Sequence, residues 1–248
     1  MKNPLKPTVL PWVTLGLGGI GLALRLWLYA GVDEKGLLPS GHPADVLLYI
    51  LTAIAAVVLF LSCLPLHPIS KYTRLFPASV WGAVGCGIGA AGLLYAAITE
   101  LFSNAGVLGI VACMAGLLAA AAMGYLALCR YKGTRPSFLL YGIITVFFML
   151  HAVCRSRLWG AEPELQRFFF QLLACVLLMA TAYQRCVLTV RKSSRRWFVL
   201  SSQAALFFCC LSLNAEYKLF YLCMAAWLAL DLCSLHTAQR QTPTPEEA

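Results

Sequence analysis

Charged residues are scarce in this sequence. Of its 248 residues, 12% are charged and 60% are hydrophobic, whereas a soluble domain carries about 25% charged and about 45–50% apolar residues. A chain with so little charge cannot cover a globule of this size with a wetted surface. The composition excludes a soluble enzyme, a disordered chain and a nucleic-acid-binding domain, and it predicts a protein surrounded mostly by lipid.

Short catalytic motifs are missing as well. The sequence contains no P-loop, no HExxH, no GxSxG and no dinucleotide-binding glycine motif. The segments between its apolar runs are too short to form a soluble catalytic domain. We therefore expect no catalytic site and no cofactor. A membrane enzyme acting on lipid is the weakest alternative, because only Asp33, His42 and Asp45 fall in one predicted outer loop.

Disulfide and metal-binding patterns are absent although cysteine is abundant. All eleven cysteines fall within or at the edge of an apolar run, and no CxxC occurs. The four histidines show no ligand spacing with them. We interpret the cysteines as small packing residues, and we predict no metal site.

Long apolar runs are what the sequence has in abundance. A membrane helix needs about 20 mostly apolar residues, and eight segments meet this requirement. The sequence therefore predicts an all-α, polytopic membrane protein with about eight transmembrane helices. Because the fifth, seventh and eighth runs are short, seven spans with one re-entrant segment is the alternative. The predicted spans are Val9–Ala30, Val46–Leu64, Ser79–Thr99, Val107–Cys129, Phe138–Cys154, Phe168–Val190, Phe198–Asn214 and Leu219–His236.

The distribution of lysine and arginine predicts the orientation of these spans. One set of alternating segments, which includes both chain ends, holds 12 of the 19 basic residues, and the opposite set holds 5. Cytoplasmic segments carry an excess of Lys and Arg, so both termini are predicted to be cytoplasmic in a multi-pass cell-membrane protein. The net charge of +9 then indicates contact with anionic lipid headgroups on that side, with no nucleic-acid partner.

Similar local features recur in the two halves of the chain. The tripeptide Arg-Leu-Trp occurs at Arg25–Trp27 and Arg157–Trp159, and Cys-Met-Ala occurs at Cys113–Ala115 and Cys223–Ala225. Such matches also arise by chance in a Leu- and Ala-rich chain, so duplication and coincidence both stay open. A duplication would give two parallel four-helix halves, and transporters often bind substrate where such repeats meet. The corresponding division is 1–129, 130–236 and a disordered cytoplasmic tail at 237–248.

Four charged residues near the predicted outer ends of spans form the candidate ligand site. Arg25 and Arg157 hold equivalent positions in the two halves, and Glu100 and Glu216 end the third and seventh spans. Ionisable groups within spans are costly and mark functional sites, and guanidinium groups match carboxylates and phosphates. We predict an outward-facing pocket for a small anionic solute. The alternative for Arg25 is that its side chain snorkels to the interface.

Three further ionisable residues are candidates for proton or ion coupling. Asp231 lies deep in the last span and needs a partner or water. Arg185, in the sixth span, is its best-placed partner by predicted depth. His151 can exchange a proton near neutral pH, and it shares a helix face with Arg155. A structural ion pair and a structural hydrogen bond are the respective alternatives.

Glycines gather on one face of the third span. Gly82, Gly85, Gly89 and Gly92 approximate a single stripe, and such a stripe allows another helix to approach closely. We expect packing within the protein rather than a dimer interface. The glycine-rich part of the first span, residues 16–21, is one candidate for the helix that packs there.

Two functions from different classes fit these features. The first is a small permease or permease-like subunit for a small anionic or polar solute, supported by the eight spans, the recurring features and the outer arginines. The second is a non-transporting membrane scaffold, sensor or lipid-binding partner in an assembly with another membrane protein, supported by the sparse buried charge. A continuous polar cavity reaching Arg25, Arg157 and Asp231 favours the first, and a closed bundle favours the second.

Overall fold

The computed structural model shows a helical bundle. It describes residues 10–31, 42–64, 72–103, 106–159, 168–190, 195–214 and 217–240. Within these ranges, eight helices are long and apolar enough to cross a membrane, so the predicted class and the number of spans are confirmed. None of these eight helices is too short to cross, which favours eight spans over seven with one re-entrant segment.

The long helices follow the apolar runs closely. The short α3 (Tyr72–Leu75) precedes the third of them, and a 3-10 turn, η2 (Ser212–Asn214), joins the last two. The eight are α1 (Leu10–Ala30), α2 (Pro43–Cys63), α4 (Val80–Ser103), α5 (Val107–Lys132), α6 (Phe138–Trp159), α7 (Phe169–Thr189), α8 (Arg195–Leu211) and α9 (Lys218–Arg240).

Several helices extend beyond their apolar runs, because a helix continues through polar residues once its core face is packed. The fifth long helix, α6, runs to Trp159 rather than Cys154, and α8 begins at Arg195. The last helix, α9, continues to Arg240, and the disordered cytoplasmic tail at 237–248 stays a prediction. Residues 241–248 lie outside the described chain.

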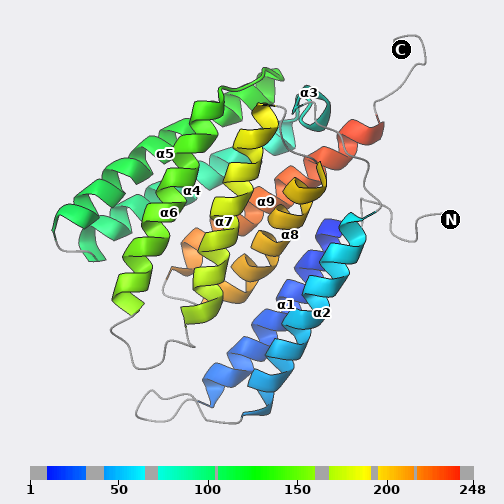
Figure 1. Ribbon diagram of the computed structural model, residues 1–248, viewed down its shortest axis with the longest axis vertical. Helices are drawn as coiled ribbons and strands as arrows, with labels where there is room; N and C mark the ends of the chain where they lie inside the picture. Colours follow the sequence, from blue (N-terminus) through cyan, green and yellow to red (C-terminus); the bar gives the residue numbers. More distant parts are fainter. Residues whose placement is uncertain are drawn as a thin grey trace.

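Helix pairs along opposite edges of the bundle enclose α8 and α9 (Figure 1). The α1–α2 hairpin packs against α8, whereas α4 packs against α5 and α9. The remaining contacts follow the chain from α5 through α6, α7 and α8 to α9. The predicted boundary at 129/130 falls inside α5, three residues before its end at Lys132. The division into two halves stays a prediction.

Glycines on α4 lie where α9 approaches this helix closely. A Cβ atom added at Gly92 would lie 2.6 Å from the Cβ of Cys223, and one added at Gly85 would lie 3.0 Å from the Cβ of Leu230. The glycine stripe of α4 therefore receives α9, which confirms packing within the protein. The first span packs elsewhere, because Gly18 and Gly21 face α8.

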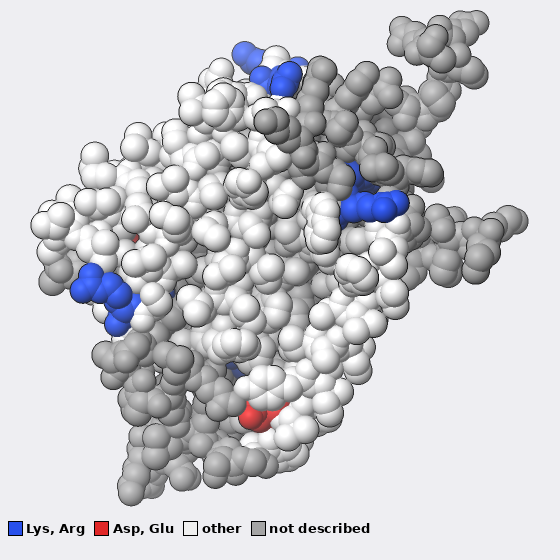
Figure 2. Space-filling view, in the orientation of Figure 1, with Lys and Arg blue, Asp and Glu red and all other residues white. Residues whose placement is uncertain are grey.

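Charged side chains on the surface lie near the two ends of the bundle. The start of α1 and the end of α9 lie at one end (Figure 1), which we call the terminal end. The helices α1, α4, α6 and α8 finish at the other end, which we call the opposite end. Charged side chains on the visible face lie near these ends, and a broad uncharged surface runs between them (Figure 2). This surface has the character of a lipid-facing wall.

Candidate functional site

Ionisable side chains buried within the described chain gather mainly in two clusters. The Asp231 cluster lies near the terminal end and contains Asp231, Arg130 and Arg185. The Glu100 cluster lies near the opposite end and contains Glu100, His151 and Arg155. Every one of these six side chains is at most 3% exposed, so each depends on protein partners for its polar contacts.

Asp231 connects three helices. Its Oδ1 lies 3.1 Å from Nη2 of Arg130 on α5, and its Oδ2 lies 2.6 Å from Nη2 of Arg185 on α7. The contact with Arg185 is an ion pair rather than a formed hydrogen bond, because its N–H direction misses the oxygen. Arg130 also donates to the hydroxyl of Ser234. With two guanidinium groups and one carboxylate, the cluster carries a fixed net charge of about +1.

Aromatic rings face the surplus positive charge of this cluster. The guanidinium carbon of Arg185 lies 4.4 Å from the centre of the Trp227 ring and 5.1 Å from that of Phe198. The guanidinium carbon of Arg130 lies 4.7 Å from the centre of the Phe76 ring. The negative faces of aromatic rings attract cations, more strongly where water is excluded. These rings therefore stabilise a charge that the single carboxylate leaves unbalanced.

A glycine on α4 makes room for this cluster. Gly82 lies where an added Cβ would come within 2.6 Å of Nη2 of Arg130, so the glycine lets the guanidinium lie against α4.

Beside the cluster, the hydroxyl groups of Tyr72 and Tyr141 are 2.9 Å apart. Burial raises the pKa of Tyr72 well above its ordinary value, and the neighbouring Tyr141 adds to this effect. Tyr72 therefore stays a neutral phenol.

One carboxylate oxygen of Glu100 contacts three nitrogen atoms. Its Oε1 accepts a hydrogen bond of 2.8 Å from Nε of Arg155, and Nη2 of the same side chain lies 2.7 Å away. Nδ1 of His151 lies 2.7 Å from that oxygen. On its other side, Arg155 donates to the hydroxyl of Tyr217 and stacks 3.7 Å from the centre of that ring. The Tyr217 hydroxyl lies 2.9 Å from Oγ of Ser103.

His151 is the least satisfied member of the Glu100 cluster. Its side chain is fully buried between the rings of Phe147 and Phe220, whose centres lie 5.7 and 5.0 Å from that of the imidazole. Neither ring nitrogen has a hydrogen-bond partner of good geometry. The 2.7 Å approach to Glu100 is therefore a close charge contact, because the N–H direction does not point at the oxygen.

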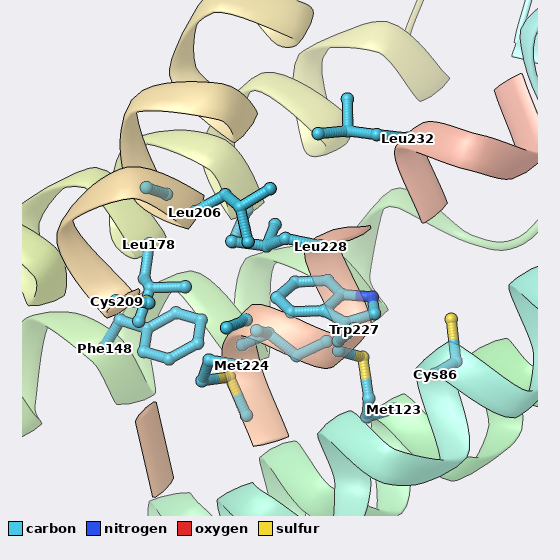
Figure 3. Close-up of a cluster of buried hydrophobic side chains, with 14 of the residues drawn as sticks. Cys86, Met123, Phe148, Leu178, Leu206, Cys209, Met224, Trp227, Leu228 and Leu232 are labelled. Carbon is cyan, nitrogen blue, oxygen red and sulfur yellow. The ribbon is translucent and has the colours of Figure 1, made fainter. Parts of the chain in front are cut away.

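A layer of apolar side chains lies between the two clusters, and Figure 3 shows members of this layer. On α9, Met224, Trp227 and Leu228 lie between Tyr217 and Asp231 and are fully buried. From Tyr217 to Asp231 the helix rises about 20 Å at 1.5 Å per residue. Further members of the layer come from α5, α6, α7 and α8; they are Met123, Phe148, Leu178 and Leu206.

The predicted ligand residues do not meet at one place in the described chain. Arg25 is buried against α8, where its Nη1 donates to the carbonyl of Leu211 at 2.6 Å. Arg157 is exposed on α6, and Glu100 contacts Arg155 and His151. Glu216 lies outside the described residues. Arg25 therefore contacts the carboxyl end of α8, a position that favours cations.

The predicted partner of Asp231 is confirmed, since Arg185 lies at ion-pair distance. Arg130 is not among the predicted site residues, and Arg155 is predicted only to share a helix face with His151. The signal for Arg155 was its predicted depth, because it and Glu100 both fall near the outer ends of their spans. No comparable signal marks Arg130.

The fold and the two buried clusters define the class: this is an all-α, multi-pass integral membrane protein. No protein-family model matches the chain, and neither a curated protein nor a solved structure is similar to it. The described residues hold no group of three or more His, Cys, Asp or Glu side chains that could bind a metal ion. All eleven cysteines are free thiols.

Proposed function

We propose that this protein is a non-transporting membrane scaffold that binds anionic lipid headgroups at its terminal end. The observation that carries the proposal is the apolar layer between the clusters. A solute or proton crossing the bundle would have to pass Trp227, Met224 and Phe148, which are fully buried. Polar paths through membrane proteins are lined by ionisable groups or water-filled cavities, whereas this layer contributes mainly aromatic, aliphatic and thioether groups, with the thiols of Cys86 and Cys209 beside them.

Lipid binding is supported by the basic side chains at the terminal end. Lys132, Arg135 and Arg196 are exposed there, close to where α5 ends and α8 begins. Basic residues near a membrane surface attract anionic lipid by about 1 kcal/mol each. The same charge bias supports a cell-membrane orientation with both termini in the cytoplasm. Alkaline phosphatase fused to the carboxyl end is expected to be inactive, and a fluorescent protein fused there is expected to fold.

A flux measurement tests the scaffold proposal directly. The purified protein is reconstituted in liposomes that contain a pH-sensitive dye, and a potassium gradient with valinomycin drives proton entry. A panel of small carboxylates and phosphate is then tested for counterflow. We expect rates equal to those of protein-free liposomes. Flux that disappears in Asp231→Asn or Arg25→Gln would contradict the proposal and support a permease.

A permease for a small anionic solute is the second candidate. Its support is that α4, α7 and α9 lie beside both clusters. A rearrangement of these helices that opened the apolar layer would join two charged regions. The flux measurement above separates the two candidates.

Lipid selectivity tests the positive part of the proposal. Phosphatidylglycerol binding to the protein in nanodiscs is compared with phosphatidylcholine binding by native mass spectrometry. The triple variant Lys132→Gln, Arg135→Gln, Arg196→Gln is expected to lose the preference for phosphatidylglycerol. Arg157→Gln is the matched control, because it removes an exposed charge at the opposite end. Equal losses in both variants would contradict binding at the terminal end.

A further inference from the structure

His151 is unusual among the buried polar residues because an imidazole, which can gain a proton, lies against a buried carboxylate. The side chain is fully buried, and both ring nitrogens lack a well-aligned hydrogen bond. Buried polar groups in proteins are nearly always hydrogen-bonded. Glu100 does not require the imidazole, since Arg155 already donates to its Oε1. A phenylalanine or leucine would pack between Phe147 and Phe220 without this polar cost.

From these contacts, we infer that His151 and Glu100 form a proton-binding site that tightens the opposite end of the bundle when the imidazole is protonated. The proton comes from water on that side, and it forms one N–H bond at the imidazole. Glu100 stays a carboxylate and Arg155 stays a cation. The charge of the cluster then changes from about zero to about +1, and the 2.7 Å contact with Glu100 becomes an ion pair joining α6 to α4.

The imidazole of His151 is surrounded by titratable side chains from several helices, and only some of them carry charge. Glu100 approaches from α4 and Arg155 lies one turn further along α6. The thiol of Cys175 on α7 interacts with the ring, and this thiol in turn lies 3.6 Å from the hydroxyl of Tyr221 on α9. From α5, Gly116 faces the neighbouring Phe147. Glu100 is thus the anionic group in contact with the imidazole.

A polar connection leads from the cluster towards the opposite end. Arg155 donates to Tyr217, which is 8% exposed. Tyr217 in turn contacts Ser103, whose side chain is exposed. These side chains extend the polar network of the cluster to the surface at the opposite end, where water can reach it, whereas the apolar layer closes the other direction. The site therefore binds a proton from one side only, which is compatible with a scaffold that does not transport.

Imidazole titration in a protein with one histidine tests this inference. His42→Asn, His67→Gln and His236→Gln leave His151 as the only histidine, and Asn at position 42 preserves a side-chain cap for α2. Nitrogen-15 NMR of the labelled imidazole in micelles is recorded from pH 5 to pH 10. We expect one titration, and we expect Glu100→Gln to move its midpoint. A ring whose shifts stay constant over this range overturns the inference.

Thermal unfolding supplies a second, independent readout. The parent protein is expected to lose roughly 2–4 °C of melting temperature between pH 5 and pH 10 relative to His151→Gln, the size of shift that one charge contact produces in a chain of this length. His42→Asn should keep the slope of the parent. Identical slopes in the parent and His151→Gln would overturn the inference, and if His151→Gln fails to fold, the NMR titration decides. Proton flux in liposomes would contradict the scaffold proposal and leave this site intact.

Discussion

The two buried clusters use similar groups in different geometries. Each places one carboxylate between two basic side chains. In the Asp231 cluster, Arg130 and Arg185 approach separate carboxylate oxygens. In the Glu100 cluster, three nitrogens converge on a single oxygen, and one of them belongs to an imidazole. The first arrangement fixes three helices to a central anion, and the second leaves the basic groups competing for one acceptor.

This difference shows two roles for a buried charged cluster. One cluster keeps the same charge and stabilises the fold, and the other can change its charge with pH. Arginine stays protonated at all accessible pH values, so the charge of the Asp231 cluster is constant and aromatic rings stabilise it. Histidine can gain or lose a proton within the accessible pH range, so the charge of the Glu100 cluster can change by one unit. We expect the first cluster to dominate stability and the second to dominate pH dependence.

Removal of the central anion from the Asp231 cluster gives the largest expected effect. Asp231→Asn keeps the shape of the side chain and leaves two guanidinium groups buried without a counter-ion. Loss of one partner from a buried ion pair costs about 3–5 kcal/mol of unfolding free energy. The loss is measured by SDS-driven unfolding in mixed micelles, followed by circular dichroism.

Asp45→Asn provides a matched control for this variant. Asp45 lies partly exposed in the first turn of α2, where its carboxylate contributes about 0.3–1 kcal/mol through the helix dipole. If Asp231→Asn and Asp45→Asn were equally stable, the Asp231 cluster would contribute no more to stability than a partly exposed charge at a helix end.

Removal of the anion from the Glu100 cluster is expected to cost less. Glu100→Gln keeps an oxygen acceptor, and Arg155 retains the Tyr217 hydroxyl and the stacked ring. The loss of a charged hydrogen-bond partner costs about 1.5–3 kcal/mol. Measured as above, this variant should be more stable than Asp231→Asn and should lose the pH slope of the parent. The reverse order of stability would contradict the comparison.

Removal of one hydroxyl group gives the smallest expected effect. Tyr217→Phe keeps the ring beneath Arg155 and removes the hydroxyl that contacts both Arg155 and Ser103. A typical hydrogen bond contributes about 0.5–1.5 kcal/mol. Tyr183→Phe is the control, because Tyr183 is 55% exposed on α7. Equal unfolding midpoints for the two variants would show that the hydroxyl connection does not stabilise the cluster.

Much of the fold follows from the sequence because lipid imposes a simple rule. Each apolar run long enough to cross the bilayer must form a helix that satisfies its own backbone, and all eight runs do so. The pairing of Asp231 with Arg185 was predictable for a related reason, since a buried carboxylate needs a cation at its own depth. The boundaries were less predictable, because α6, α8 and α9 continue into polar residues.

The neighbours of each helix could not be predicted from the apolar runs. The glycine stripe of α4 indicates a close partner, and any of several helices could have filled it. The structure places α9 there through Cys223 and Leu230, while Gly18 of α1 faces α8. Helix order in a bundle depends on how all side chains pack together, and no single segment carries that information.

The sequence by itself determined that this is a multi-pass membrane protein, because scarce charge and long apolar runs leave no other stable state. It also indicated that Arg185, His151 and Asp231 lie within spans, since their depth follows from their distance to the span ends, although it did not indicate the burial of Arg130. Only the tertiary structure decided which of them meet. Arg130 reaches Asp231 and Arg155 reaches Glu100 because α4, α5, α6 and α9 pack side by side, and side-chain contacts between helices depend on that packing alone.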